Sequence, residues 1–377
     1  MKQIILSVIF VLFGATCSPF DGGPVYGVQN DSIIIKAGGH NTCSITVDNT
    51  LYCWGRNTHG QLGSDKYTSD FLSTPTQVGY QSWAAIALGD FHICGITNEK
   101  SLYCWGSGIL GNEVYSEEQN PVKIGNDTWL KISRSSYTCG INTEQKLFCW
   151  GNNSFGQLGD GTTENKMVPT KIGDDTWHDV VVGSSHTCGI RTDKTLYCWG
   201  DNSYGKLGDG STYGQKNTPT KISDDAWQAI TIGGEFSCGI KELDGSRYCW
   251  GWNEFGMFGD GTTDSENVPT KTDDDVWVEI SAGWRHVCGI KSDKMIYCWG
   301  INGNGQLGSR PENKIVPTKV GSDAWRTITT GSTHSCGIKE LDNKLYCWGD
   351  NDFGEVGDGT SGDDADKYAP TLVVDPF

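Results

Sequence analysis

Short runs of alternating apolar and polar residues, separated by turn-forming residues, recur along nearly the whole chain. In residues 177–222 an apolar strand is expected at Trp177–Val182, and after a turn a second one at Thr187–Ile190. A polar turn leads to Leu196–Gly200, and after a loop rich in Gly, Asn and Asp a fourth strand opens at Pro219. These segments are too short for helices, so each unit is predicted to form four antiparallel strands.

The unit repeats seven times. The tripeptide Cys-Trp-Gly recurs at intervals of 45 to 51 residues, and seven such periods fill residues 32–377. Four short strands per period of about 40–50 residues is the signature of a propeller. The sequence therefore predicts an all-β fold, a seven-bladed β-propeller with four short antiparallel strands in each blade.

The cysteines follow the same period. Fourteen of the fifteen fall in the repeat, two per unit, separated by 10 residues in five units and by 11 in two. Opposed positions of a hairpin bring two Cα atoms within about 4.5–5.5 Å, which suits a disulfide, whereas zinc sites use cysteines two to four residues apart. One disulfide per repeat is predicted: Cys43–Cys53, Cys94–Cys104, Cys139–Cys149, Cys188–Cys198, Cys238–Cys249, Cys288–Cys298 and Cys336–Cys347.

The N-terminus has the pattern of an export signal. Lys2 precedes an apolar stretch of 12 residues, which is too short to span a bilayer and suits a signal peptide over residues 1–17. A lead-in over 18–31 and the propeller over 32–377 follow. Cys17 leaves two alternatives open, a lipid anchor on its side chain or plain cleavage nearby. The mature protein is expected to be secreted or extracytoplasmic, with no transmembrane segment, which agrees with its paired cysteines.

A second motif identifies a resemblance. Gly-x-Asn-x-x-Gly-Gln-Leu-Gly-Asp-Gly-Thr stands intact at residues 151–162, and a Gly-x-x-His-x-Cys-Gly-Ile segment accompanies it in the repeat. Together they resemble the regulator of chromosome condensation repeat family over all seven units. The resemblance implies a ring closed by pairing the first and last strands, expected at Ser32–Lys36 and Pro370–Val374. One secreted bacterial member of this type acts purely by binding the enzyme that it inhibits.

The net charge and the sequence motifs limit the classes of function that are expected of this chain. The net charge of −17 disfavours nucleic acid as a partner. No sequence motif indicates catalytic, cofactor-binding or metal-binding residues, so none is assigned and the chain is not expected to be an enzyme. Asp-rich loops are interpreted as turns rather than calcium sites. Four histidines at one repeat position are interpreted as structural: His92, His186, His286 and His334.

Variation between the repeats points to a binding surface. The loop before the first cysteine of each unit varies most and carries aromatic and Arg side chains, which are typical interface anchors. The predicted partner-binding residues on one channel rim are Phe91, Tyr137, Phe236, Trp284 and Arg285. The Gly-Asp-Gly-Thr loops are expected on the opposite face. Trp252 and Trp284 are the two Trp residues outside the repeat pattern.

These observations favour a secreted protein-binding propeller that acts by binding an unknown protein partner. Two alternatives stay open. A propeller that binds carbohydrate or a cell-surface glycan would use exposed aromatic side chains such as Trp252. A hydrolase would need a catalytic site scattered over several blades, which no sequence motif would reveal.

Overall fold

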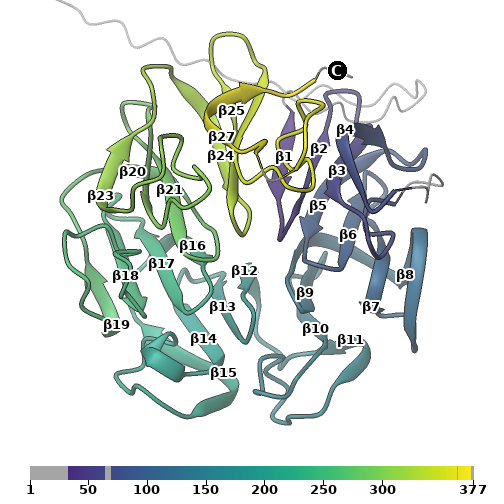
Figure 1. Ribbon diagram of the computed structural model, residues 1–377. Helices are drawn as coiled ribbons and strands as arrows, with labels where there is room; N and C mark the ends of the chain where they lie inside the picture. Colours follow the sequence, from purple (N-terminus) through teal and green to yellow (C-terminus); the bar gives the residue numbers. More distant parts are fainter. Residues whose placement is uncertain (1–32, 64–68, 363, 375–377) are drawn as a thin grey trace, which may run out of the picture.

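The computed structural model describes residues 33–63, 69–362 and 364–374. The predicted signal peptide, the lead-in segment, Cys17 and Ser32 lie outside the described residues. Figure 1 shows the described chain as a ring of small sheets, with the C-terminal strands beside the N-terminal ones. Among the described residues, no helix is long and apolar enough to cross a membrane.

Each blade contains four antiparallel strands in sequence order. The innermost strands line a central channel and are β1 (Ile34–Ala37), β5 (Trp83–Leu88), the end of β8 (Tyr115–Arg134), β12 (Trp177–Val182), β16 (Trp227–Ile232), β20 (Trp277–Ala282) and β24 (Trp325–Thr330). The second strands are β2 (Asn41–Ile45), β6 (His92–Thr97), β9 (Tyr137–Asn142), β13 (His186–Arg191), β17 (Phe236–Lys241), β21 (His286–Lys291) and β25 (His334–Lys339).

The third strands carry the Cys-Trp-Gly motif and are β3 (Leu51–Arg56), β7 (Ser101–Ile109), β10 (Leu147–Gly151), β14 (Leu196–Asp201), β18 (Arg247–Gly251), β22 (Ile296–Gly300) and β26 (Leu345–Gly349). The outermost strands are β4 (Phe71–Gln77), the beginning of β8, β11 (Lys166–Lys171), β15 (Gln215–Ser223), β19 (Glu266–Lys271), β23 (Lys314–Lys319) and β27 (Lys367–Leu372). A single 3-10 turn, η1 (Ser203–Gly205), is described. The predicted propeller is confirmed.

Blades 2 and 3 share one strand. β8 is 20 residues long; its beginning pairs with β7 as the outer strand of blade 2, and its end pairs with β9 as the inner strand of blade 3. The two blades therefore form one seven-stranded sheet. The sequence of blade 2 also has a shortened connection between β7 and β8, its third and fourth strands.

The cysteine pairs are opposed as the sequence predicts. Cys188 faces Cys198 in the β13–β14 ladder, and Cys238 faces Cys249 although one more residue separates them, because the insertion lies in the turn. Cα atoms of the pairs are 4.0 or 4.1 Å apart. All seven predicted disulfides are present.

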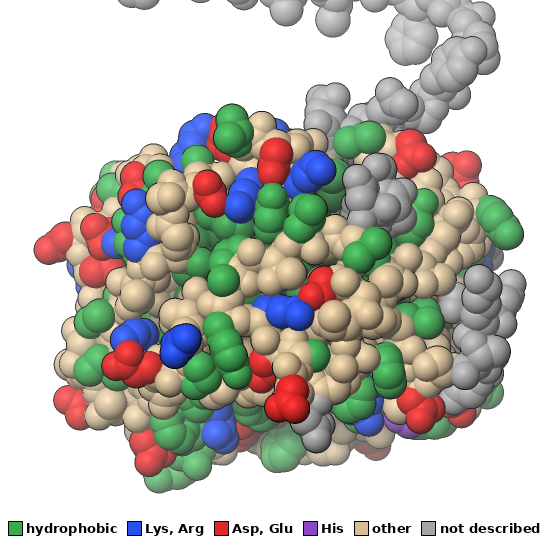
Figure 2. Space-filling model, turned by 45° about the horizontal axis from the view of Figure 1, so that its top comes forward, with side chains coloured by type: hydrophobic (Ala, Val, Ile, Leu, Met, Phe, Trp, Pro, Cys, Tyr) green, Lys and Arg blue, Asp and Glu red, His purple; other side chains and the backbone are tan. Residues whose placement is uncertain are grey.

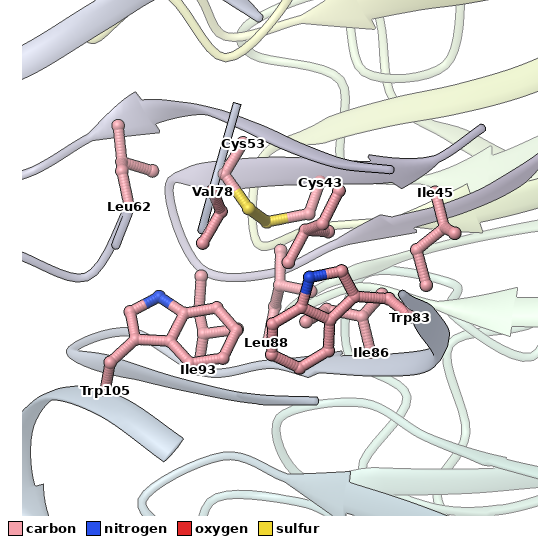
Figure 3. Packing of buried hydrophobic residues seen from close by; sticks show 11 residues of the cluster. Cys43, Ile45, Cys53, Leu62, Val78, Trp83, Ile86, Leu88, Ile93 and Trp105 are labelled. Carbon is pink, nitrogen blue, oxygen red and sulfur yellow. A yellow bond between two sulfur atoms is a disulfide. The ribbon is translucent and has the colours of Figure 1, made fainter. Parts of the chain in front are cut away.

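Successive residues of the third strand face different blades. In blade 2, Cys104 packs in the cluster shared with blade 3, whereas the next residue, Trp105, packs in the cluster shared with blade 1. Side chains alternate between the two faces of a strand, so one dipeptide serves two interfaces. Figure 3 shows one such interface, where the Cys43–Cys53 disulfide of blade 1 lies beside Trp83 of blade 2. Seven clusters of this kind join the seven neighbouring blade pairs.

Within the residues that the structure describes, the two ends of the ring do not pair as strands, so the predicted pairing of Ser32–Lys36 with Pro370–Val374 is wrong. β1 pairs with β2 and β27 pairs with β26. Since β1 is an inner strand and β27 an outer one, their edges lie at different radii. Blades 7 and 1 instead pack through the same contacts as other neighbours: Trp54 Nε1 donates to the Glu355 carbonyl at 2.8 Å, as Trp105 Nε1 donates to the Gln61 carbonyl at 3.0 Å.

Removing one disulfide tests its contribution. Replacing both Cys188 and Cys198 by Ala releases a loop of sequence separation 10. We expect the free energy of unfolding to fall by about 2–3 kcal/mol, because the unfolded chain regains the entropy of that loop. Chemical denaturation measures this loss. Non-reducing peptide mapping of the unchanged protein is the control, and free thiols at Cys188 and Cys198 there would contradict the pairing.

Candidate functional site

One end of the ring gathers the variable loops. Because the strands are antiparallel, the connections between strands 1 and 2 and between strands 3 and 4 leave the sheet at the same end. Arg56 N donates to His40 O at 2.7 Å, and Ile301 N donates to Arg285 O at 2.9 Å, each joining a 3–4 loop to a 1–2 loop. We call this end the loop face.

The Gly-Asp-Gly-Thr loops also belong to the loop face, which corrects the expectation that they form the opposite one. They lie in the 3–4 connections, toward the outer edge of the ring. Gly161 N, for example, donates to Asn217 O in β15 of the next blade. The opposite face is formed by the 2–3 hairpin turns and the connections between blades.

Two of the five predicted anchors are buried, and the expectation of exposed side chains is wrong for them. Tyr137 and Phe236 are both 0% exposed. They are the first residues of β9 and β17, the position that His186 occupies in β13. The side chain at this position points to the next blade: Tyr137 Oη lies 2.7 Å from Thr187 Oγ1, and burial raises the pKa of Tyr137.

The other three predicted anchors lie on the loop face. Phe91 is 47% exposed and Trp284 44% exposed, and Arg285 is also exposed. These residues precede the buried position by one or two places, in the turn between the first two strands. Trp284 lies at the mouth of the channel over Gly234, whose amide donates to the Trp284 carbonyl at 3.0 Å.

Arg285 joins an aromatic cluster built by three blades. Its guanidinium carbon lies 5.2 Å from the Trp252 ring centroid and 5.3 Å from that of Phe255. Trp252 in turn contacts Phe255 at 5.2 Å and Tyr204 at 5.7 Å between ring centroids. We call Tyr204, Trp252, Phe255, Trp284 and Arg285 the aromatic patch.

Tyr204 and Phe255 are functional candidates that sequence reasoning missed. Both stand before the first Gly of the Asn-x-x-Gly loop, where several blades place an aromatic residue: His59, Phe155, Tyr204, Phe255 and Phe353. This recurrence was the available signal. Phe353 makes a similar contact at the interface between blades 7 and 1, which we call the seam: the Arg56 guanidinium lies 5.3 Å from its ring centroid.

The repeat histidines are structural, as predicted, in three blades. His186 Nε2 lies 3.0 Å from Ser237 Oγ, and that hydroxyl donates to the Lys206 carbonyl at 3.0 Å. The hydroxyl hydrogen is thus used, so Nε2 carries the proton and donates. The same arrangement joins His286 to Ser335 and His334 to Thr42. Burial lowers the pKa of His286 to about 3 and of His334 to about 4, which keeps both rings neutral.

Two blades replace the buried Gln of the 3–4 loop by a charged residue. Lys206 is 0% exposed, and its Nζ lies 2.6 Å from Asp201 and 2.5 Å from Glu235 of the next blade. Glu355 is also fully buried, and its Oε1 accepts from His40 Nδ1 at 3.2 Å across the seam. Each charge is therefore paired with the blade that follows it.

Two groups of side chains near the seam have the donors that a cation prefers. His40, Asp350 and Glu355 place one ligand atom each within 4.8 Å of one another, and so do Asp350, Asp352 and Asp366. Burial raises the pKa of Glu355, and it raises the pKa of Asp366 to about 6. The hydrogen bond to Glu355 raises the pKa of His40. The sequence predicted no metal site, and hydrogen bonds within the fold already engage these groups.

Three of the hollows on the described surface lie at the channel or at the seam. The channel mouth on the loop face has a volume of about 250 Å³ and is lined mainly by Gly and Ser of the 1–2 loops. The channel interior, about 360 Å³, is lined by the inner strands. A more apolar hollow of about 510 Å³ lies at the seam on the opposite face, between Val47 and Leu372. Figure 2 shows acidic and basic side chains interspersed over the visible surface, with no single charge dominating it.

The fold and the loop face define a class of protein: a disulfide-linked, seven-bladed propeller with a buried repeated framework and a variable face. A family model for the RCC1-like domain matches residues 22–279, more than half of the chain. Models of the regulator of chromosome condensation (RCC1) repeat match residues 277–306, 325–355 and 293–338. The chain belongs to the RCC1-like domain family, which confirms the predicted resemblance.

Relatives match over shorter stretches. The probable E3 ubiquitin-protein ligase HERC4 of Rattus norvegicus is 27% identical over 150 residues, 37% of this chain and 14% of HERC4. The ultraviolet-B receptor UVR8 of Arabidopsis thaliana is 27% identical over 147 residues, 37% of this chain and 33% of UVR8. The chain thus covers less than two thirds of the length of these relatives.

A solved structure agrees with the propeller fold. Prp20p from Saccharomyces cerevisiae superimposes with a TM-score of 0.76 at 19% identity, covering 88% of this chain and 87% of Prp20p. At that identity the similarity shows the fold alone.

The Glu355–His40 pair provides a test at the seam. Glu355→Gln introduces the residue found at 61, 157 and 306. We expect the pKa of His40 to fall toward its ordinary value, because a neutral amide oxygen stabilises the imidazolium less than the carboxylate whose hydrogen bond is the largest cause of the elevation. Protonation of His40 stabilises the fold below the unfolded-state pKa, and this stabilisation is lost as the pH rises through the folded-state pKa. The variant should show less of this pH dependence.

An NMR titration of the imidazole resonances measures the change. His178, which is exposed and on β12, is the internal control and should titrate as before. An unchanged His40 titration in Glu355→Gln would contradict the pairing.

Proposed function

We propose that this chain is an extracytoplasmic protein-binding propeller that holds its partner on the loop face, through the aromatic patch, and acts by binding rather than by catalysis. The observation that carries the proposal is the contact of Arg285 with Trp252 and Phe255. Three blades contribute to this patch, and its Trp252, Trp284 and Arg285 are not residues of the repeat. Trp, Tyr and Arg are the residues most enriched among energetically dominant interface anchors.

The disulfides support a location outside the cytoplasm. Seven buried disulfides would not persist in a reducing cytosol, whereas they are stable in secreted proteins. The N-terminal pattern of Lys2 and an apolar stretch is in keeping with export. Family membership supports a binding role, and the Prp20p structure is described with binding properties toward Gsp1p and histones.

The geometry favours a protein partner over a glycan. A sugar stacks on a free aromatic face, but the Trp252 ring is flanked by Tyr204 and by the Arg285 guanidinium. Trp284 and Tyr204 are about half exposed, and Trp and Tyr side chains are enriched among the residues that dominate protein–protein binding.

The geometry also favours binding over hydrolysis. His186 and Ser237 are within hydrogen-bond distance, as a nucleophile and its base would be, but both are 0% exposed. The serine hydroxyl donates to a backbone carbonyl, and the arrangement recurs in other blades. A substrate could not reach these hydroxyls without opening the interface between two blades.

Substitutions on the loop face test the proposal. Trp284→Ala and Arg285→Ala should each weaken the complex at least tenfold, which corresponds to about 1.4 kcal/mol of binding free energy. Leu243→Ala is the matched control, because Leu243 is 94% exposed on a 2–3 turn of the opposite face. Crosslinking from the native extracellular fluid should recover a protein that the Trp284 and Arg285 variants lose and the Leu243 variant keeps.

Titration calorimetry with the recovered protein then gives the dissociation constants, and circular dichroism checks that each variant is folded. If folded Trp284→Ala and Arg285→Ala bind as tightly as the unchanged protein, the partner does not use this patch. If Leu243→Ala alone loses the partner, the opposite face is the interface.

A further inference from the structure

Arg134 stands at the junction between the channel mouth and the channel interior. It is the last residue of β8 and lines both hollows. The other inner strands end in uncharged residues: Ala37, Leu88, Val182, Ile232, Ala282 and Thr330. Arg134 is 5% exposed. Blade 3 thus places a buried cation where the other described blades have a small or apolar side chain.

The guanidinium of Arg134 is under-bonded. Nη2 donates to Ser135 O at 3.1 Å, whereas Nε and Nη1 have no acceptor among the described residues. Among the residues that the structure describes, no carboxylate oxygen lies within 4 Å of the guanidinium nitrogens of Arg134. Asp90 is the acidic residue of the mouth, and it is exposed at the rim. Burial lowers the pKa of Arg134, and Asp90 offsets this only in part.

A buried charge without a partner is costly, so buried charges in proteins are paired and hydrogen-bonded. The nearby serine hydroxyls are neutral, so they cannot supply the missing negative charge, and their hydrogens already have acceptors. Ser136 Oγ donates to Ser184 O at 3.0 Å, and Ser184 Oγ donates to Gly234 O at 3.4 Å, so these hydroxyl hydrogens are used within the ring of loops. Arg134 is therefore the strong donor that the mouth has left for a ligand.

We propose that the channel mouth is a binding site for a small oxyanion, a carboxylate or a phosphate, with Arg134 as its counter-charge. The planar guanidinium fork matches the oxygens of either group. The hollow of about 250 Å³ opens on the loop face and admits such a group from solution. The mouth shares only Trp284 with the aromatic patch, and the charge proposed to bind the oxyanion belongs to Arg134, which is not part of that patch.

The test uses the folded, disulfide-bonded protein with two probes, inorganic phosphate and malonate, at matched ionic strength in sodium chloride. Titration calorimetry should give saturable binding of at least one probe. Arg134→Gln should weaken this binding at least tenfold, whereas Arg326→Gln, which removes an exposed arginine elsewhere, should leave it unchanged. Binding of phosphate alone or malonate alone identifies the class of ligand.

Two further measurements keep the result unambiguous. Asp90→Asn removes the acidic side chain of the mouth and should tighten binding of the probe. The Arg134 Nε–H resonance of the unchanged protein should shift as the probe is added, which tests the site even if Arg134→Gln fails to fold. No binding of either probe, binding that Arg134→Gln retains, or binding seen only in Asp90→Asn would each overturn the proposal.

Discussion

The alternation of side chains along the third strand of each blade is the constraint on which the structure depends. One residue of the Cys-Trp pair packs toward the following blade and the next toward the preceding one, so each blade contributes to two cores at once. The glycine that follows is required by its backbone conformation and by the close approach of the 1–2 loop of the same blade. Gly55 has φ +100°, and a Cβ there would lie 2.5 Å from His40 O. Stability is therefore shared among seven similar interfaces, as in other repeat proteins.

This sharing explains how the ring closes. The first and last blades need no common strand, because the interface between them has the same Trp-to-carbonyl hydrogen bond and the same kind of apolar cluster as the others. It also explains the charged substitutions. Lys206 and Glu355 take the place of a buried Gln, and each is paired with a residue of the next blade, Glu235 or His40. A buried charge is tolerated in the repeat where the neighbouring blade supplies its partner.

Arg134 departs from the repeat without such a partner among the described residues, and the aromatic patch includes Trp252, Trp284 and Arg285, which are not residues of the repeat. Both lie toward the loop face, where the residues of the connections differ from blade to blade. A repeat fixes its interior by the demands of packing and leaves the loops free to vary. The departures from the repeat are therefore the most informative places to look for function in this protein.

The sequence by itself determined the features that depend on residues close together in the chain. Strand periodicity, the seven periods and the opposition of cysteines ten or eleven residues apart follow from local pattern, because a hairpin's register is set by its own turn. It also supplied Phe91, Trp284 and Arg285 as exposed candidates.

Only the tertiary structure decided which side of each strand meets the neighbouring blade. That choice buries Tyr137 and Phe236, although they belong to the same variable segment as Trp284. It also brings Arg285 onto Trp252, which lies in another blade, and leaves Arg134 facing the channel. These relations depend on how whole sheets pack against one another, and the pattern within one repeat contains no information on the contacts between two.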